Sequence, residues 1–169
     1  MTTLVESDLE ITLPVGAHGR KLDDAAMHGL SHCMKAVDFV VELADRIYFI
    51  ELKDPDNPAA RAEAKAAFAK KLQSGTLDGE LQRKYRDSFL YEWASSRANK
   101  PIYFIVLLAL SALGPPDLLA RTESLKKQLP LNGPGDKAWP RPFVSGCAVM
   151  NIASWNKQLG SMPVRRISA

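Results

Sequence analysis

The sequence predicts an α/β protein in which a mixed central β-sheet is flanked by helices. Three observations predict this class. Residues 37–53 read as two strands joined by a tight turn, residues 59–74 and 80–98 have the spacing of amphipathic helices, and residues 102–108 form an apolar run typical of a buried strand. Elements that alternate in this way pack in layers around one core. We expect residues 1–169 to form a single domain, since this length supports one sizeable core.

The remaining elements follow from local patterns. The helix over residues 59–74 is expected to start at a cap on Asp56 or Asn57 and to stop at Gly75. The other predicted elements are an edge strand over 9–14, a short helix over 22–34, helices over 117–128 and 155–159, a strand over 143–152 and a terminal basic strand or tail over 164–167.

The composition is that of an ordinary globular protein, with 46% hydrophobic and 24% charged residues and a net charge of +3. This net charge is too small to indicate nucleic-acid binding, but its distribution is uneven. Residues 38–56 hold six acidic and two basic residues, whereas residues 83–100 hold five basic and two acidic residues. An acidic pocket beside a basic helix suits a metal-dependent enzyme that acts on a phosphate polymer.

The sequence also predicts the compartment. Cys33 and Cys147 have no metal-site spacing and form no disulfide framework, which favours a reducing cytoplasm. The N-terminal residues lack the basic and apolar segments of a signal peptide. The longest apolar run, residues 102–113, is too short to span a bilayer. We therefore expect a cytoplasmic protein without a membrane partner.

Three polar residues stand out in the predicted hairpin: Asp38, Glu51 and Lys53. Successive side chains of a strand point to opposite faces, so each strand has an apolar set on the face away from these residues. If the two strands pair around a turn near residues 44–46, Asp38 and Glu51 converge. Lys53 then stands roughly 6.6 Å beyond Glu51 along the strand, at 3.3 Å per residue.

Two carboxylates and one ammonium on a shared face indicate metal-dependent chemistry. Neighbouring carboxylates repel each other and one pKa rises, unless a cation lies between them. A hard divalent cation, Mg²⁺ or Mn²⁺, meets that need with oxygen ligands, and substrate phosphate can complete its shell. The Lys53 ammonium would orient or deprotonate the attacking water, or stabilise charge on the phosphoryl group.

The pattern of Asp38, followed after twelve residues by Glu-Leu-Lys at 51–53, resembles the D…(D/E)-x-K signature of the PD-(D/E)xK nuclease-like superfamily. In that family the two parts of the signature lie on adjacent strands and bind Mg²⁺ at the cut phosphodiester. Val37 stands where the proline that names the family would be. The resemblance covers residues 35–55 and extends loosely to residue 110, since hairpin, helix and buried strand is the order of the family's core after its first helix.

This resemblance implies a restriction-endonuclease-like core and Mg²⁺- or Mn²⁺-dependent hydrolysis of nucleic-acid phosphodiester bonds, DNA before RNA. The implied catalytic residues are Asp38, Glu51 and Lys53, and the implied metal ligands are Asp38, Glu51 and the carbonyl of Leu52. Many relatives place a further acidic residue upstream, for which the candidates are Glu6, Glu10, Asp23 and Asp24. A chain this short would need a homodimer or a partner protein to choose a site or to cut both strands.

Polar side chains on the helix over 80–98 and near the C-terminus are candidate nucleic-acid contacts. In the family, the helix that follows the ExK strand packs beside the active site and often contributes a polar side chain. The candidates are Gln82, Arg83, Lys84, Arg86, Arg165 and Arg166. On the same helix Leu81, Tyr85, Phe89 and Trp93 recur every four residues and are predicted to face the core.

Three other interpretations stay open. The E-x-K pattern can be a solvated strand face with weak surface ion pairs. The same fold can carry a catalytically inactive module that binds nucleic acid or a partner. His28 and His32, at positions i and i+4 of the predicted helix over 22–34, could bind Zn²⁺ in a small hydrolase of another fold, although no HExxH motif and no further ligands are apparent.

Overall fold

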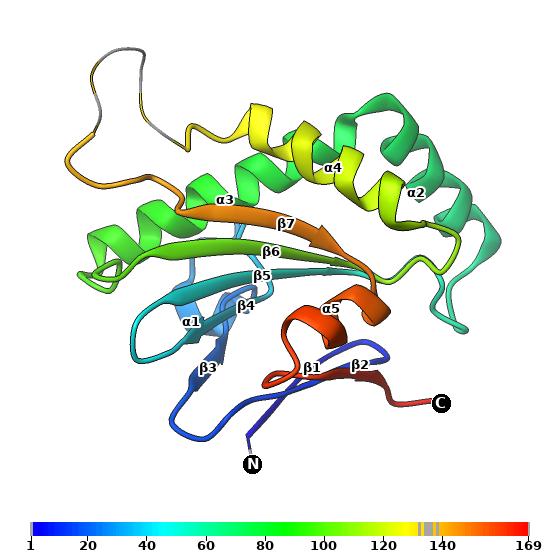
Figure 1. Ribbon diagram of the computed structural model, residues 1–169, viewed down its shortest axis with the longest axis horizontal. Coiled ribbons are helices and arrows are strands. Elements are labelled where there is room, and N and C mark those ends of the chain that lie inside the picture. Colours follow the sequence, from blue (N-terminus) through cyan, green and yellow to red (C-terminus); the bar gives the residue numbers. More distant parts are fainter. Residues whose placement is uncertain (1, 132, 134–136, 138, 169) are drawn as a thin grey trace.

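The computed structural model describes residues 2–131, 133, 137 and 139–168 and is built on a five-stranded mixed sheet (Figure 1). The strands, in spatial order, are β3 (His18–Lys21), β4 (Phe39–Glu42), β5 (Ile47–Lys53), β6 (Ile102–Leu108) and β7 (Gly146–Met150). The first three pair in antiparallel fashion, and β6 and β7 join them in parallel. The predicted α/β class with a mixed sheet is confirmed.

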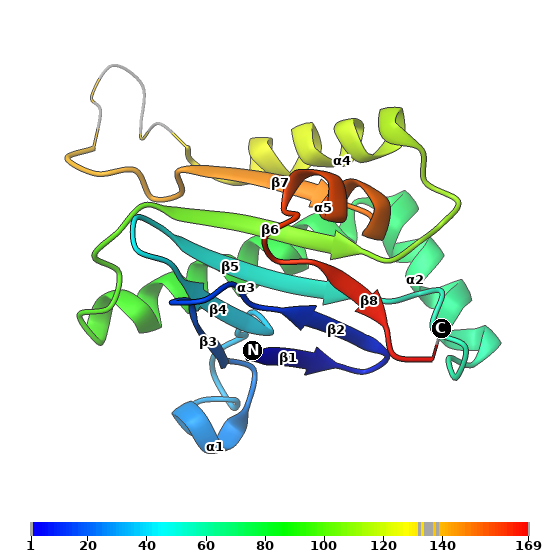
Figure 2. The same cartoon turned by 60° about the horizontal axis from the view of Figure 1, so that its bottom comes forward.

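Helices cover one face of this sheet, and a smaller sheet covers the other (Figures 1 and 2). The helices on the first face are α2 (Ala62–Ser74), α3 (Thr76–Ala94) and α4 (Pro115–Gln128). The second face carries α5 (Ile152–Gln158) and the antiparallel sheet of β1 (Thr3–Glu6), β2 (Leu9–Thr12) and β8 (Val164–Arg166). A short helix, α1 (Ala25–His28), follows β3.

Both faces of the β4–β5 hairpin are buried, although the sequence pattern suggests a half-buried hairpin. Val40 and Phe49 pack towards α3, in one core that includes Tyr85. Phe39 and Ile50 pack towards α5 and the small sheet, in a second core. The hairpin therefore holds Asp38 and Glu51 within the molecule, where burial raises the pKa values of their carboxyl groups.

Two predicted elements near the N-terminus have different roles in the fold. Strand β2 is the middle strand of the small sheet, between β1 and β8, and is not the predicted edge strand. The helix predicted over 22–34 is only α1, because Gly29 adopts a left-handed conformation with φ of +63° directly after its last residue. The sequence pattern missed the position of β2 because its second neighbour, β8, comes from the far end of the chain.

The helices match their predicted positions with shifted ends. Helix α2 stops at Gly75 as predicted, but it starts at Ala62, since Asn57 accepts a hydrogen bond from the backbone N–H of Ala59 and Asp56 is bound to Ser111. Helix α3 runs four residues earlier than predicted, because it starts directly after that glycine. Helix α5 starts earlier as well, since Asn151 caps it by accepting from the N–H of Ser154 at 2.8 Å.

The predicted core stripe of α3 is wrong at its end. Trp93 is 60% exposed, whereas Leu81 and Tyr85 are buried. A repeat of four residues drifts by about 40° per step around a helix with about 100° per residue, so its fourth member has left the buried face. The buried stripe continues instead through Ser88 and Glu92.

Within the described part of the chain, none of the helices is long and apolar enough to cross a bilayer.

Candidate functional site

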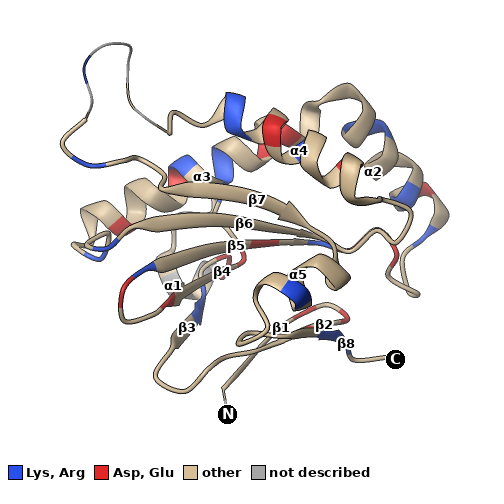
Figure 3. Cartoon of the chain, in the orientation of Figure 1, with Lys and Arg blue, Asp and Glu red and all other residues tan. Residues whose placement is uncertain are grey.

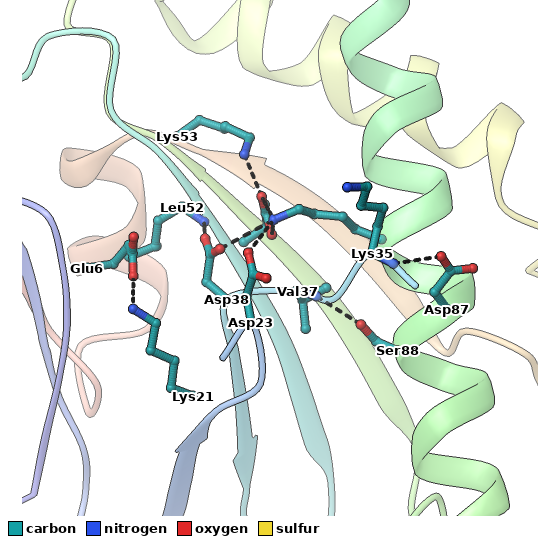
Figure 4. A network of polar contacts seen from close by, with 12 residues as sticks. Glu6, Lys21, Asp23, Lys35, Val37, Asp38, Leu52, Lys53, Asp87 and Ser88 are labelled. Carbon is teal, nitrogen blue, oxygen red and sulfur yellow. Dashed lines mark hydrogen bonds and ion pairs between the residues drawn. The ribbon is translucent and has the colours of Figure 1, made fainter. Parts of the chain in front are cut away.

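The hairpin brings the two signature carboxylates together at one end of adjacent strands. Asp38 directly precedes β4, and its backbone carbonyl accepts a hydrogen bond from the N–H of Leu22 at 2.9 Å. Its side-chain Oδ2 accepts from the backbone N–H of Leu52 at 2.7 Å (Figure 4). Glu51 is fully buried, and Asp38 is 6% exposed. Leu52 therefore contacts Asp38 through its backbone N–H group, and this hydrogen bond holds the Asp38 carboxylate next to Glu51.

Two lysines neutralise these carboxylates. The Nζ atom of Lys53 lies 2.6 Å from Oε1 of Glu51. The Nζ atom of Lys84, which comes from α3, lies 2.8 Å from the same oxygen, 3.4 Å from Oδ1 of Asp38 and 3.3 Å from Oδ2 of Asp23. The sequence predicts Lys84 as a phosphate contact, but the structure places it at the centre of the carboxylate cluster.

The packing of α3 explains the position of Lys84. This residue stands between Leu81 and Tyr85, at the margin of the helix face that packs on the sheet. The same helix anchors the segment before Asp38, since Ser88 Oγ accepts from the backbone N–H of Val37 at 2.9 Å. A signal for its role was present in the sequence, because a lysine next to a buried stripe must direct its ammonium to a carboxylate or to water.

The pKa values of Asp38, Glu51 and Lys84 are all raised, by burial for the two carboxyls and by the neighbouring negative charges for Lys84. Burial raises the pKa of Asp38, against the effects of Lys84 and the Leu52 N–H. Burial and the Asp38 charge raise the pKa of Glu51, against the effects of Lys53 and Lys84. Burial on its own lowers the pKa of Lys84, but the charges of Glu51 and Asp38 outweigh it, so that its pKa is above the ordinary value. The ammonium of Lys84 therefore stays protonated over the working pH range.

The raised pKa of Glu51 predicts a pH-dependent difference in stability. Its contribution to stability is present below the ordinary value of 4.5 and is lost as pH rises through the folded-state pKa. We expect Glu51→Gln to gain stability relative to the wild type as pH rises from about 4 to about 8. Thermal unfolding of both proteins in EDTA across this range measures the difference. A difference that is constant, or that moves the other way, would contradict the assigned shift.

The structure separates the four candidates for a further acidic residue. Asp23 contacts the cluster through Lys84. Glu6 lies 2.7 Å from Lys21 and acts on Asp38 through its charge, raising the pKa of that carboxyl. The other two candidates lie in other contacts: Glu10 binds Arg165 at 2.7 Å, and Asp24 accepts from the backbone N–H of Ala26 at 2.9 Å.

The five candidate nucleic-acid contacts other than Lys84 divide into two groups. Gln82 donates to the backbone carbonyl of Gln128 at 2.6 Å. Arg166 binds Asp54 at 2.7 Å and Asp8 at 3.2 Å, and Arg165 binds Glu10. The side chains in this group make contacts within the fold. In particular, the ion pair of Arg166 with Asp54 links β8 to the end of β5. The second group is formed by two exposed arginines of α3 that have no ion pair or hydrogen bond within the described residues: Arg83 and Arg86.

The structure removes the geometric basis of the zinc interpretation. Helix α1 ends at His28, so His32 is not one turn further along the same helix. His28 Nδ1 instead accepts from the backbone N–H of Leu30 at 2.9 Å. Among all residues that the structure describes, no group of three or more His, Cys, Asp or Glu side chains is arranged to hold a metal ion.

The pair of Asp38 and Glu51 fits one kind of metal ion. Two carboxylates suit Mg²⁺ or Mn²⁺, which completes its shell with water and substrate phosphate, and do not suffice for a closed structural site. In this structure Lys53 and Lys84 supply the positive charge beside these buried carboxylates. We compared the chain with protein-family models, curated proteins and solved structures, and none of them matches it.

Proposed function

We propose that this protein is a Mg²⁺-dependent nuclease that hydrolyses phosphodiester bonds, of DNA before RNA, on a restriction-endonuclease-like core. The observation that carries the proposal is the meeting of Asp38 and Glu51 at one end of β4 and β5, with Lys53 beside them. Their sequence pattern resembles the signature of the PD-(D/E)xK superfamily. The order of the elements supports the core, since an antiparallel hairpin is followed by α2, α3 and the parallel strand β6.

Each residue has a role in this proposal. Asp38 and Glu51 would hold the metal ion, which when bound would polarise the phosphoryl oxygen and lower the pKa of its water. The Leu52 N–H holds Oδ2 of Asp38 and leaves Oδ1 directed to the cluster. Lys53 is less buried than Glu51, with a side chain that is 27% exposed, and would orient the attacking water or stabilise phosphate charge.

The charge distribution supports a polyanionic substrate. Figure 3 shows Lys and Arg along α2, α3 and α4, together with Asp and Glu on the same helices. Arg83 and Arg86 are exposed on the helix that carries Lys84. Exposed guanidinium groups, which here have no acidic partner in the part of the chain that the structure describes, are suited to phosphate contacts, and such contacts give affinity without reading the base sequence.

One observation favours a second function, an inactive module that binds nucleic acid or a partner protein. Lys53 and Lys84 already neutralise the carboxylates, so the cluster can be stable without any metal ion. Such a module would bind nucleic acid with a steep dependence on salt. It would show no metal affinity that depends on Asp38 and Glu51.

Calorimetric titration with Mn²⁺ tests the proposed function and separates it from the inactive module. We expect the wild type to bind Mn²⁺ at neutral pH and to cleave DNA with Mg²⁺, and Asp38→Ala/Glu51→Ala to do neither. Glu10→Ala/Asp24→Ala is a matched control, because it also removes two carboxylates, both outside the cluster. Equal Mn²⁺ binding by the wild type and the cluster variant, or no binding by either, would contradict the nuclease proposal.

A further inference from the structure

We infer that the ammonium of Lys84 occupies the position of the divalent cation in the metal-free protein, so that metal ion and Lys84 exchange at the carboxylates. This inference rests on the metal site of the proposed function and adds to it a step that regulates metal binding. Neither the signature pattern nor the composition points to it, because it depends on where α3 places one side chain.

The contacts of Lys84 are those of a cation shared between acidic groups. Its Nζ lies 2.8 Å from Oε1 and 3.1 Å from Oε2 of Glu51, and 3.4 Å from Oδ1 of Asp38. An ammonium has three donors, and the third carboxylate near it is that of Asp23, at 3.3 Å. Lys53 differs, since among the described residues its one ion pair is with Glu51. Lys84 is thus central in the cluster, and Lys53 is peripheral.

The metal ion and the Lys84 ammonium cannot share this position. A Mg²⁺ ion held by Asp38 and Glu51 would take up carboxylate oxygens of both residues as ligands. The Nζ atom of Lys84 contacts carboxylate oxygens of both residues as well. A metal ion and an ammonium that contact the same carboxylate oxygens repel each other strongly in a buried site. The ammonium must therefore move away when the metal ion binds.

The structure gives Lys84 a route and a partner for this movement. The side chain of Lys84 is 18% exposed, and its stem of four methylene groups is flexible. Asp23 is its most exposed partner, with a side chain that is 50% exposed. The displaced ammonium can keep that ion pair nearer to solvent, where it would also reach a phosphate of the substrate. Metal ion and nucleic acid would then favour each other's binding, since the phosphate compensates the displaced charge.

Mn²⁺ titration of Lys84→Met tests the exchange, with Lys53→Met as the control that removes the peripheral ammonium. We expect Lys84→Met to bind Mn²⁺ at least about tenfold more tightly than the wild type, because the competing cation is gone. The gain in Lys53→Met should be clearly smaller. Circular dichroism and thermal unfolding verify that each variant is folded. An affinity of Lys84→Met that is equal to or below that of the wild type would overturn the inference.

A measurement on the wild type keeps the inference testable if Lys84→Met does not fold. In protein labelled with ¹⁵N and ¹³C at lysine, the side-chain signal of Lys84 should shift on titration with Mg²⁺ more than that of Lys53. An unchanged Lys84 signal at metal saturation, or no metal binding by the wild type and Lys84→Met alike, would overturn it. If the metal ion displaces Lys84 but DNA is not cleaved, the inference holds and the nuclease function is contradicted. If DNA is cleaved but Lys84 is not displaced, the nuclease function holds and the inference is contradicted.

Discussion

The Asp38→Asn and Glu51→Gln variants are expected to lose at least about a thousandfold of the Mg²⁺-dependent cleavage of DNA. Each change keeps the size of the side chain and removes a charge that would hold the metal ion. Metal-ion catalysis supplies several kcal/mol to the transition state, and about 1.4 kcal/mol corresponds to a factor of ten in rate. Initial rates on labelled single-stranded and double-stranded DNA measure the loss.

Both variants should keep the fold, because an amide can occupy the same space within the cluster. Asp38→Asn keeps an oxygen that can accept from the Leu52 N–H, and Lys84 keeps its contacts with the carboxylates that remain. Glu42→Gln is the matched control, since Glu42 is on β4 and pairs with Lys100 at 2.6 Å, outside the cluster. Folded Asp38→Asn with wild-type cleavage would refute the assignment of this carboxylate as a metal ligand.

The largest expected effect on stability is that of Trp155→Ala, at about 3–5 kcal/mol. Trp155 is fully buried, and its indole N–H donates to the backbone carbonyl of Met162 at 2.7 Å. It lies in the core that joins α5 and the small sheet to the face of β5 opposite the carboxylates. The variant leaves a cavity between the two sheets and a carbonyl without its donor, so both terms destabilise the fold.

Chemical denaturation gives the change in the free energy of unfolding for this variant. Trp93→Ala is the matched control, since the same side chain is removed from a site where it is 60% exposed. Its expected effect is within about 0.5 kcal/mol. A loss below about 1 kcal/mol for Trp155→Ala would mean that the small sheet does not depend on this core.

The two signature residues of β5 could be placed from local pattern. An apolar run that carries Glu51 and Lys53 predicts a strand, and the turn before it predicts an antiparallel partner that starts near Asp38. The end of α2 at Gly75 is predictable for a similar reason, because a left-handed residue after a helix favours glycine. These features depend on interactions between residues that are close in sequence.

The roles of the remaining residues depend on contacts between distant parts of the chain. Arg166 and Gln82 are residue types that often contact phosphate. In the fold, however, Arg166 pairs with Asp54, and Gln82 donates to the backbone carbonyl of Gln128. Trp93 leaves the core because the helical period differs from four residues. A local pattern shows that a side chain is polar or apolar, but not which group will stand opposite it.

The sequence by itself determined the α/β class, the main strands and helices, and the presence of Asp38, Glu51 and Lys53 on a hairpin, since strand and helix periods are local properties. Only the tertiary structure decided that the hairpin is covered on both faces, that β1, β2 and β8 form their own sheet, and that Lys84 enters the carboxylate cluster. The physical reason is that burial and ion pairing at this cluster depend on the packing of α3 against β5, across 33 residues of sequence.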